Sequence, residues 1–230
     1  MKFETIFLGI TLMIICATFV TLFLKAFYHK KFKNTLIYKG LASICFVIFG
    51  GVNFFIGEFS WVKLALFIGL ALGIVGDEIL ALCQIYPERD TVHFLGGGVF
   101  FVIGHVFYIA AMLMMNGPNW IAVIISFIVL ISLSFVYNSK RKFFIGSLKN
   151  SLVLYISIVI FFAAVGVSTF LKHGSIGSAL LARGGVLFVI SDNILFAFKF
   201  GEKPRYFQNI ALHVAYYLAQ IMIAWSIALI

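Results

Sequence analysis

The sequence predicts an all-α, polytopic membrane protein, a bundle of eight transmembrane helices. The first observation is composition: of the 230 residues, 63% are hydrophobic and only 11% are charged, whereas a soluble domain is about 25% charged. The second is that the hydrophobic residues form long unbroken runs, unlike the weak alternating segments of a transmembrane β-barrel. These observations exclude a soluble globular enzyme.

Each apolar run is long enough to cross a bilayer, which takes roughly 20 residues in a helix. The runs follow one another with short connections, so the chain 1–230 is predicted to be a single transmembrane domain. The first run exceeds the apolar core of a cleavable signal and lacks a small-residue cleavage site, so we expect it to remain as a helix. The predicted spans are 5–27, 36–56, 61–83, 93–115, 119–137, 148–171, 176–200 and 206–230.

The basic residues predict the orientation in the membrane. The net charge of +9 would suggest nucleic acid in a soluble protein, but here Lys and Arg lie between apolar runs and face anionic lipid, so no nucleic acid is expected. Positively charged loops stay in the cytoplasm, which predicts both termini outside, in what we expect to be a bacterial cytoplasmic membrane. The basic residues predicted to face the cytoplasm are Lys25, Lys30, Lys31, Lys33, Lys39, Arg89, Lys140, Arg141, Lys142, Lys149, Lys199, Lys203 and Arg205, and those predicted to face the outside are Lys2, Lys63, Lys172 and Arg183.

The oligomeric state stays open.

Three acidic residues lie inside predicted spans: Asp77, Glu78 and Asp192. An Asp at the centre of a membrane helix costs about 2.5–3.5 kcal/mol, so each such residue is a functional hypothesis. Asp77 and Asp192 are similarly far from the cytoplasmic ends of two spans that run in the same direction, so we expect them at similar depth. Glu78 lies about 100° round the helix from Asp77 and is expected to face the cytoplasmic interface.

Further polar residues predict a polar cavity in the cytoplasmic half of the bundle. Four on the last span follow the i, i+3, i+4, i+7 spacing of one helix face. A lone His or Tyr is usually a packing residue, but four on one face favour a cavity wall. The stripe is His213, Tyr216, Tyr217 and Gln220, and Lys39, His105 and Tyr155 join it from other spans.

A weak internal repeat relates the two halves of the chain. Residues 76–80 align with 191–195, which places Asp77 on Asp192. Two parallel four-helix repeats would share a pseudo-twofold axis along the membrane normal. Such an axis would bring the two carboxylates to equal depth.

No metal or cofactor is expected. The cysteines Cys16, Cys45 and Cys83 lie in or at the end of apolar runs, are odd in number and form no CxxC, so we expect neither a disulfide framework nor a zinc site. Metal-ligand spacings such as HExxH do not occur.

Four ordered stretches carry a resemblance to a known family. They are Gly69-Leu70 through Gly73 to Gly76-Asp77 and Leu80; Gly98 to Phe101 with Gly104-His105 and Tyr108; Leu187-Phe188-Val189-Ile190-Ser191-Asp192 ending at Lys199-Phe200; and Tyr216-Tyr217-Leu218-Ala219-Gln220. With Lys39 and Tyr155 at the starts of two spans, the chain resembles the YhhN-like lysoplasmalogenase family of multi-pass membrane proteins over nearly its full length. It departs from that family at Glu78, where an apolar residue is usual, and at Gly40, where proline is common.

The resemblance implies hydrolysis of the vinyl-ether bond of lysoplasmalogens, lysophospholipids drawn from membrane lipid, to a fatty aldehyde and glycerophospho-ethanolamine or -choline. Vinyl-ether cleavage needs a general acid, a general base for water and a negative field beside an oxocarbenium ion, which two carboxylates sharing a proton supply. We expect Asp77 and Asp192 to be this catalytic pair, and Lys39 to bind the phosphate. The residues expected to orient water or glycerol are His105, Tyr155, Tyr216, Tyr217 and Gln220.

Two other classes of function stay open. A proton-coupled membrane transporter would use the same buried carboxylates and a parallel repeat. Against it, Pro87, Pro118 and Pro204 lie in loops, so no span has a proline-broken midpoint. A non-catalytic lipid-binding or scaffold protein is the third alternative, and it would not need two carboxylates at matched depth.

Overall fold

The long apolar runs form helices because lipid offers no hydrogen-bond partners to an open backbone. The structure is a computed structural model that describes residues 3–117, 119–140, 148–201 and 205–230; most of these residues are helical, and none of them forms a strand. Every predicted span coincides with one helix, with ends that differ by a few residues. The helices are α1 Phe3–Tyr28, α2 Phe32–Ile56, α3 Trp61–Ile85, α4 Asp90–Asn116, α5 Trp120–Lys140, α6 Lys149–His173, α7 Ile176–Phe200 and α8 Tyr206–Ser226, with a short 3₁₀ helix η1 at Pro87–Arg89.

The all-α class and the multi-pass membrane character are confirmed. Among the described residues, six helices are long and apolar enough to cross a membrane, namely α1, α2, α3, α4, α6 and α7. The exact number of spans stays a prediction. So does the internal repeat, although α4 packs on α6 and α2 packs on α8, the two pairs that a twofold axis would exchange.

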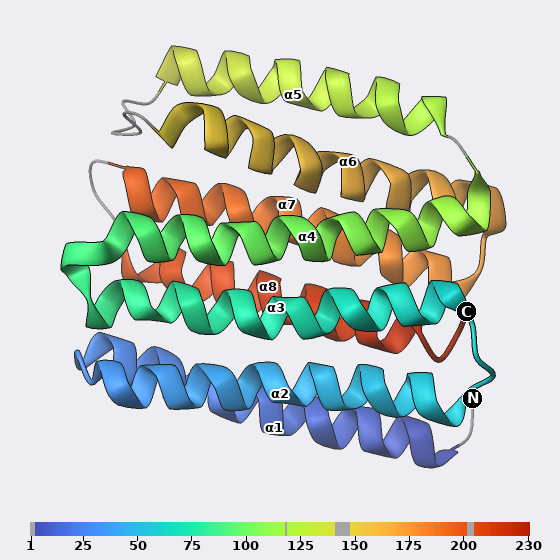
Figure 1. Cartoon of the computed structure of the whole chain (residues 1–230), viewed down its shortest axis with the longest axis horizontal. Coiled ribbons are helices and arrows are strands. Elements are labelled where there is room, and N and C mark those ends of the chain that lie inside the picture. Colours follow the sequence, from blue (N-terminus) through green and yellow to red (C-terminus); the bar gives the residue numbers. More distant parts are fainter. Residues whose placement is uncertain (1–2, 118, 141–147, 202–204) are drawn as a thin grey trace.

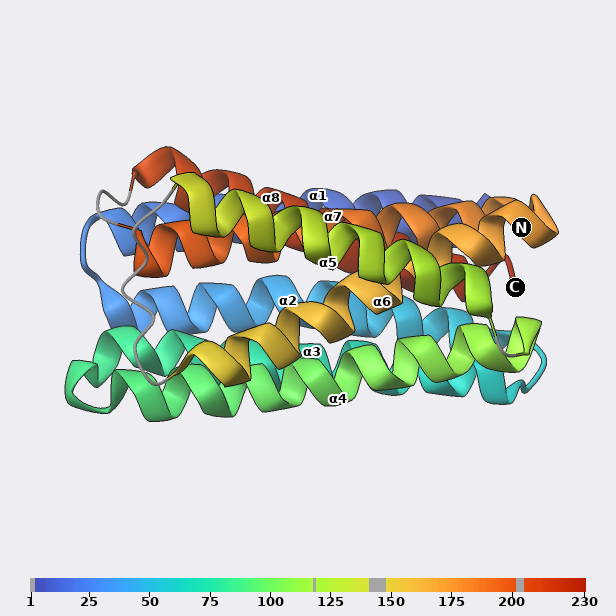
Figure 2. The same cartoon turned by 90° about the horizontal axis from the view of Figure 1, so that it is seen from above.

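The helices lie in two layers along a common axis (Figures 1 and 2). One layer holds α2, α3 and α4 and the other holds α1, α8 and α7. Helix α6 crosses obliquely and packs against both α4 and α7, and α5 packs on the outside of α6. The edge of the bundle between α4 and α7 is therefore bridged by α6.

The C-terminal ends of α1, α3 and α7 and the N-terminal ends of α2, α4 and α8 gather at one end of the bundle, called here the α3–α4 end, whereas α1 begins and α8 ends at the other end (Figure 1). This arrangement matches the distribution of basic residues, which predicts that every second connection lies on the same side of the membrane. The cytoplasmic assignment of the α3–α4 end itself stays a prediction. Of the residues behind that assignment, Lys2, Arg141, Lys142 and Lys203 lie outside the described part of the chain.

Helices α3 and α4 approach closely because glycines face each other along their contact. A Cβ atom at Gly97 would lie 3.0 Å from the carbonyl oxygen of Gly76, and one at Gly104 would lie 3.2 Å from that of Gly69. Small residues of this kind are what lets helix backbones meet in a membrane. The neighbouring Gly98 differs, since a Cβ there would have nothing within 4 Å.

We predict that Gly97→Ala destabilises the bundle and that Gly98→Ala does not. The added methyl of the first variant meets backbone at a packed contact, an overpacking error that typically costs about 1–3 kcal/mol. Thermal unfolding of detergent-purified protein measures the difference as a lower midpoint for Gly97→Ala alone. Equal midpoints for the two variants would contradict this account of the α3–α4 contact.

A candidate active site between the layers

A cavity of about 560 Å³ lies between the two layers, toward the α3–α4 end. Among the residues that the structure describes, every helix except α5 contributes to its wall. Most of the wall surface is apolar, but charged and polar side chains also line it. Of the eight site residues predicted from sequence, five line this cavity: Lys39, Asp77, Tyr155, Asp192 and Tyr216.

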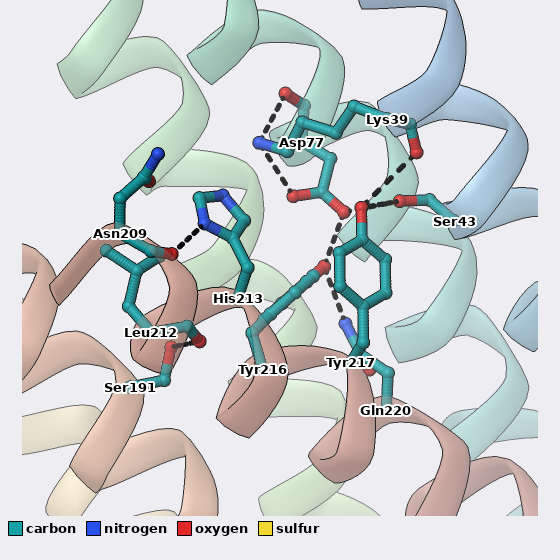
Figure 3. A network of polar contacts seen from close by, with 10 residues as sticks. All are labelled: Lys39, Ser43, Asp77, Ser191, Asn209, Leu212, His213, Tyr216, Tyr217 and Gln220. Carbon is teal, nitrogen blue, oxygen red and sulfur yellow. Dashed lines mark hydrogen bonds and ion pairs between the residues drawn. The ribbon is translucent and has the colours of Figure 1, made fainter. Parts of the chain in front are cut away.

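Asp77 is buried and fully partnered. Its Oδ1 forms an ion pair with Lys39 Nζ at 3.1 Å, and the same Nζ donates to the Asp77 carbonyl oxygen at 3.1 Å. Its Oδ2 accepts hydrogen bonds from Ser43 Oγ and Tyr216 Oη, both at 2.7 Å. Helices α2 and α8 thus supply a cation and two hydroxyl donors to one carboxylate of α3 (Figure 3). Asp77 is therefore held as an anion.

A second set of side chains orients these partners. Gln220 Nε2 donates to Tyr216 Oη at 3.0 Å, and Tyr108 Oη donates to Gln220 Oε1 at 2.9 Å. Tyr217 Oη donates to the carbonyl oxygen of Lys39 at 3.3 Å. Gln220 and Tyr217 were expected to touch substrate, but neither lines the cavity. In this structure Gln220 contacts Tyr216 and Tyr217 contacts Lys39, two residues that do line the cavity.

Asp192 has a sparser environment, although it faces the same cavity. Among the described residues, one side chain hydrogen-bonds to its carboxylate: Tyr155 Oη on α6 donates to Oδ2 at 2.9 Å. No cation lies within ion-pair distance in that part of the chain. Asp77 and Asp192 each lie eight residues before the end of their helix, about 12 Å at 1.5 Å per residue. The two carboxyl groups therefore differ in their partners and agree in depth.

His105 lies behind the cavity wall rather than on it. Its Nδ1 hydrogen-bonds with the Phe101 carbonyl oxygen at 2.6 Å, and its ring packs edge-on against Tyr155, with centroids 6.3 Å apart. It is buried, and its Nε2 has no hydrogen-bond partner among the described residues. Direct contact with substrate stays an untested prediction for this residue.

Sequence reasoning missed several polar residues of the site. Ser43 lies one helical turn after Lys39, so the i, i+4 rule would have placed it on the same face. Asn209 and His213 line the cavity beside Tyr216, and His213 Nδ1 hydrogen-bonds with the Asn209 carbonyl oxygen at 2.7 Å (Figure 3). His213 belonged to the predicted stripe without being chosen as a site residue. Asn209 sits one turn earlier on the same stripe, which is the signal that could have found it.

Gly40 and Glu78, the two positions expected from the sequence to depart from the family pattern, lie next to each other. A Cβ atom at Gly40 would lie 2.7 Å from Glu78 Oε1, so the Glu78 carboxylate occupies the space that a larger residue at position 40 would need. Glu78 does not line the cavity. Glycine at position 40 therefore leaves room for the Glu78 side chain between α2 and α3.

Comparison with known proteins identifies the family of this chain. The YhhN family model matches residues 34–227, a range that includes all of the residues named above. The chain belongs to the YhhN family, which confirms the resemblance found in its motifs, and the family is one of multi-pass membrane proteins. No curated protein and no solved structure matches the chain.

We predict that Lys39→Met is strongly destabilising, because it leaves the Asp77 carboxylate buried without its cation. Removing one partner of a buried ion pair costs about 3–5 kcal/mol. The double variant Lys39→Met with Asp77→Asn removes both charges and should recover much of that loss. Thermal unfolding in detergent is the measurement, with Lys172→Met, at an exposed lysine of α6, as the control. A Lys39→Met midpoint equal to that of the control would refute the structural role of the pair.

Proposed function

We propose that the protein is an intramembrane hydrolase that cleaves the vinyl-ether bond of lysoplasmalogens by acid/base catalysis. The observation that carries the proposal is a pair of carboxyl groups at matched depth on one largely apolar cavity, one with a cation and one without. The volume of about 560 Å³ falls within the roughly 300–1,000 Å³ of small-molecule sites. Membership of the YhhN family supports the same reading.

The contacts favour Asp192 as the proton donor and Asp77 as the permanent anion. Asp77 accepts an ion pair and two hydroxyl hydrogen bonds, so its negative charge is fixed in place. Among the described residues Asp192 has no such cation, and Tyr155 orients its carboxyl group. Two carboxyl groups whose surroundings differ in this way are the usual basis for dividing acid and base roles.

The reaction then needs no group beyond these side chains and one water. Asp192 transfers its proton to the vinyl carbon β to the ether oxygen, which leaves an oxocarbenium ion and an Asp192 carboxylate. Water adds to the carbon beside the oxygen and gives its proton to that carboxylate, which forms a hemiacetal. The hemiacetal collapses to a fatty aldehyde and the glycerol alcohol. The Asp77 carboxylate stabilises the cation between these steps.

The apolar wall between α4 and α6 suits the hydrocarbon chain. Val99 and Leu154 line the cavity and are also exposed on the lipid-facing surface, by 55% and 63%. The cavity therefore reaches the outside of the bundle at this point. A single-chain lipid could enter from the bilayer with its tail along α4 and α6 and its ether oxygen toward the carboxyl pair.

We predict that Asp77→Asn and Asp192→Asn each lower turnover by at least about 100-fold, the usual contribution of a general acid or base. The assay is aldehyde release from lysoplasmenyl-ethanolamine by detergent-purified protein, beside the saturated alkyl-ether analogue. Unfolding midpoints show that the variants are folded. Aldehyde from the vinyl ether alone supports the proposal. No aldehyde from folded wild-type protein would reject the proposed reaction and favour the transporter, whereas full activity in either variant would reject the carboxyl pair as its catalytic groups.

We predict that Gly98→Leu blocks the site without disturbing the fold. Gly98 lines the cavity, and a Cβ there points into open space, so a leucine fills volume that substrate needs. The same assay should show a KM raised about tenfold or more at an unchanged unfolding midpoint, while Gly98→Ala causes a smaller rise. An unchanged KM in Gly98→Leu would mean that substrate does not pass this part of the wall.

A further inference from the structure

The cavity carries a second ion pair that the proposed chemistry does not use. Asp90 is the first residue of α4 and Lys199 is the last but one of α7, so both lie at the α3–α4 end. Lys199 Nζ pairs with Asp90 Oδ1 and stands 5.2 Å from the centre of the Phe94 ring. Both charged side chains line the same cavity as the carboxyl pair.

The two ion pairs of the cavity differ in how easily they can exchange partners. The side chains of Lys39 and Asp77 are 7% and 3% exposed, whereas those of Lys199 and Asp90 are 26% and 39% exposed. Opening a buried pair leaves uncompensated charge, but a partly solvated pair contributes little and opens at small cost. The outer pair is therefore the one that a charged ligand can displace.

Two unpartnered amide groups lie on the same wall. Asn209 is buried, in the first turn of α8, and its Nδ2 has no hydrogen-bond partner among the described residues. Gln84 is the last but one residue of α3, and its buried Oε1 likewise has no partner among the described residues. Both residues line the cavity at the α3–α4 end. Buried polar atoms normally have partners, so an orphan donor and an orphan acceptor here indicate a polar ligand.

We infer that Asp90 and Lys199 form a subsite for a zwitterionic phospho-amine headgroup, with the phosphate on Lys199 and the ammonium on Asp90. This inference rests on the proposed function and names the headgroup of its substrate. When the zwitterion binds, the ion pair between Asp90 and Lys199 is replaced by two ion pairs with the headgroup, and the net charge of the site stays the same. Asn209 can donate to a phosphate oxygen, and Gln84 can accept from the ammonium.

The distances along the helices fit this placement. Lys199 lies seven residues beyond Asp192 on α7, about 10 Å along the helix axis. Nine bonds separate the ether oxygen of a glycerophosphoethanolamine lipid from its amine, and an extended chain covers roughly 1.2 Å per bond, or about 10 Å. A substrate with its vinyl ether at the carboxyl pair would therefore present its headgroup to Asp90 and Lys199.

The test measures binding without catalysis. Three saturated ethers share one chain: hexadecylglycerol, its phosphate and its phosphoethanolamine. Each competes with a radiolabelled alkyl-ether lysophosphoethanolamine for purified full-length protein in detergent micelles. Wild-type protein should bind the phosphoethanolamine lipid about tenfold or more tighter than hexadecylglycerol, the factor that a charge-assisted contact supplies. Free phosphoethanolamine, which has no chain, should compete far more weakly.

The variants separate the two halves of the headgroup. Lys199→Gln should lose most of the affinity that the phosphate adds over hexadecylglycerol, and Lys199→Arg should retain that affinity. Asp90→Asn should keep the preference for phosphate over glycerol but lose about tenfold of the preference for phosphoethanolamine over bare phosphate. The control is Lys172→Gln, whose lysine donates to the Asn116 carbonyl oxygen at the other end of the bundle and does not line the cavity.

Three results would overturn the subsite. They are equal wild-type affinity for all three lipids, an unchanged phosphate preference in Lys199→Gln, and free phosphoethanolamine that competes as well as the lipid. Because the ligands lack a vinyl ether, the outcome does not depend on turnover. Headgroup preference without aldehyde release would reject the proposed reaction alone, and aldehyde release without headgroup preference would reject the subsite alone.

Discussion

The buried charge of Asp77 is the constraint on which the rest of the structure depends. A carboxylate inside a membrane bundle is costly unless cations and hydrogen-bond donors meet it there. Lys39 and Ser43 come from α2 and Tyr216 comes from α8, so three helices must meet at one depth for the charge to be tolerated. The supporting contacts of Tyr217 and Gln220 then fix α8 against α2 and α3. One charge thereby determines the register of the central helices.

The two carboxyl groups are held in a similar way but have different partners, and the proposed division of acid and base roles rests on that difference. Each is held by a side chain from the preceding helix: Lys39 on α2 for Asp77, and Tyr155 on α6 for Asp192. A lysine fixes a negative charge, whereas a tyrosine hydroxyl only orients the group. Glycine contacts bring α3 and α4 together, while α6 bridges α4 and α7, and the cavity occupies the space between the layers.

Much of the site could be predicted from the sequence because burying a charge in lipid is so unfavourable. Asp77 and Asp192 stand out on that ground alone, and the spacing of Tyr216 and its neighbours indicates one helix face. What lies opposite that face could not be predicted. Lys39 was expected to bind phosphate, yet its ammonium group is engaged by Asp77. The pairing of Asp90 with Lys199 joins residues far apart in the chain, and no local pattern connects them.

The sequence by itself determined the membrane class, the eight helices with their approximate bounds and the two intramembrane carboxyl groups. These features follow from hydrophobicity and helical periodicity, which act over neighbouring residues. Only the tertiary structure decided which side chains line the cavity, which stand behind it and which charge is compensated. Tyr216 and Tyr217 are adjacent in sequence, but only Tyr216 lines the cavity. Adjacent residues point about 100° apart on a helix, so contact with the cavity depends on how the neighbouring helices pack.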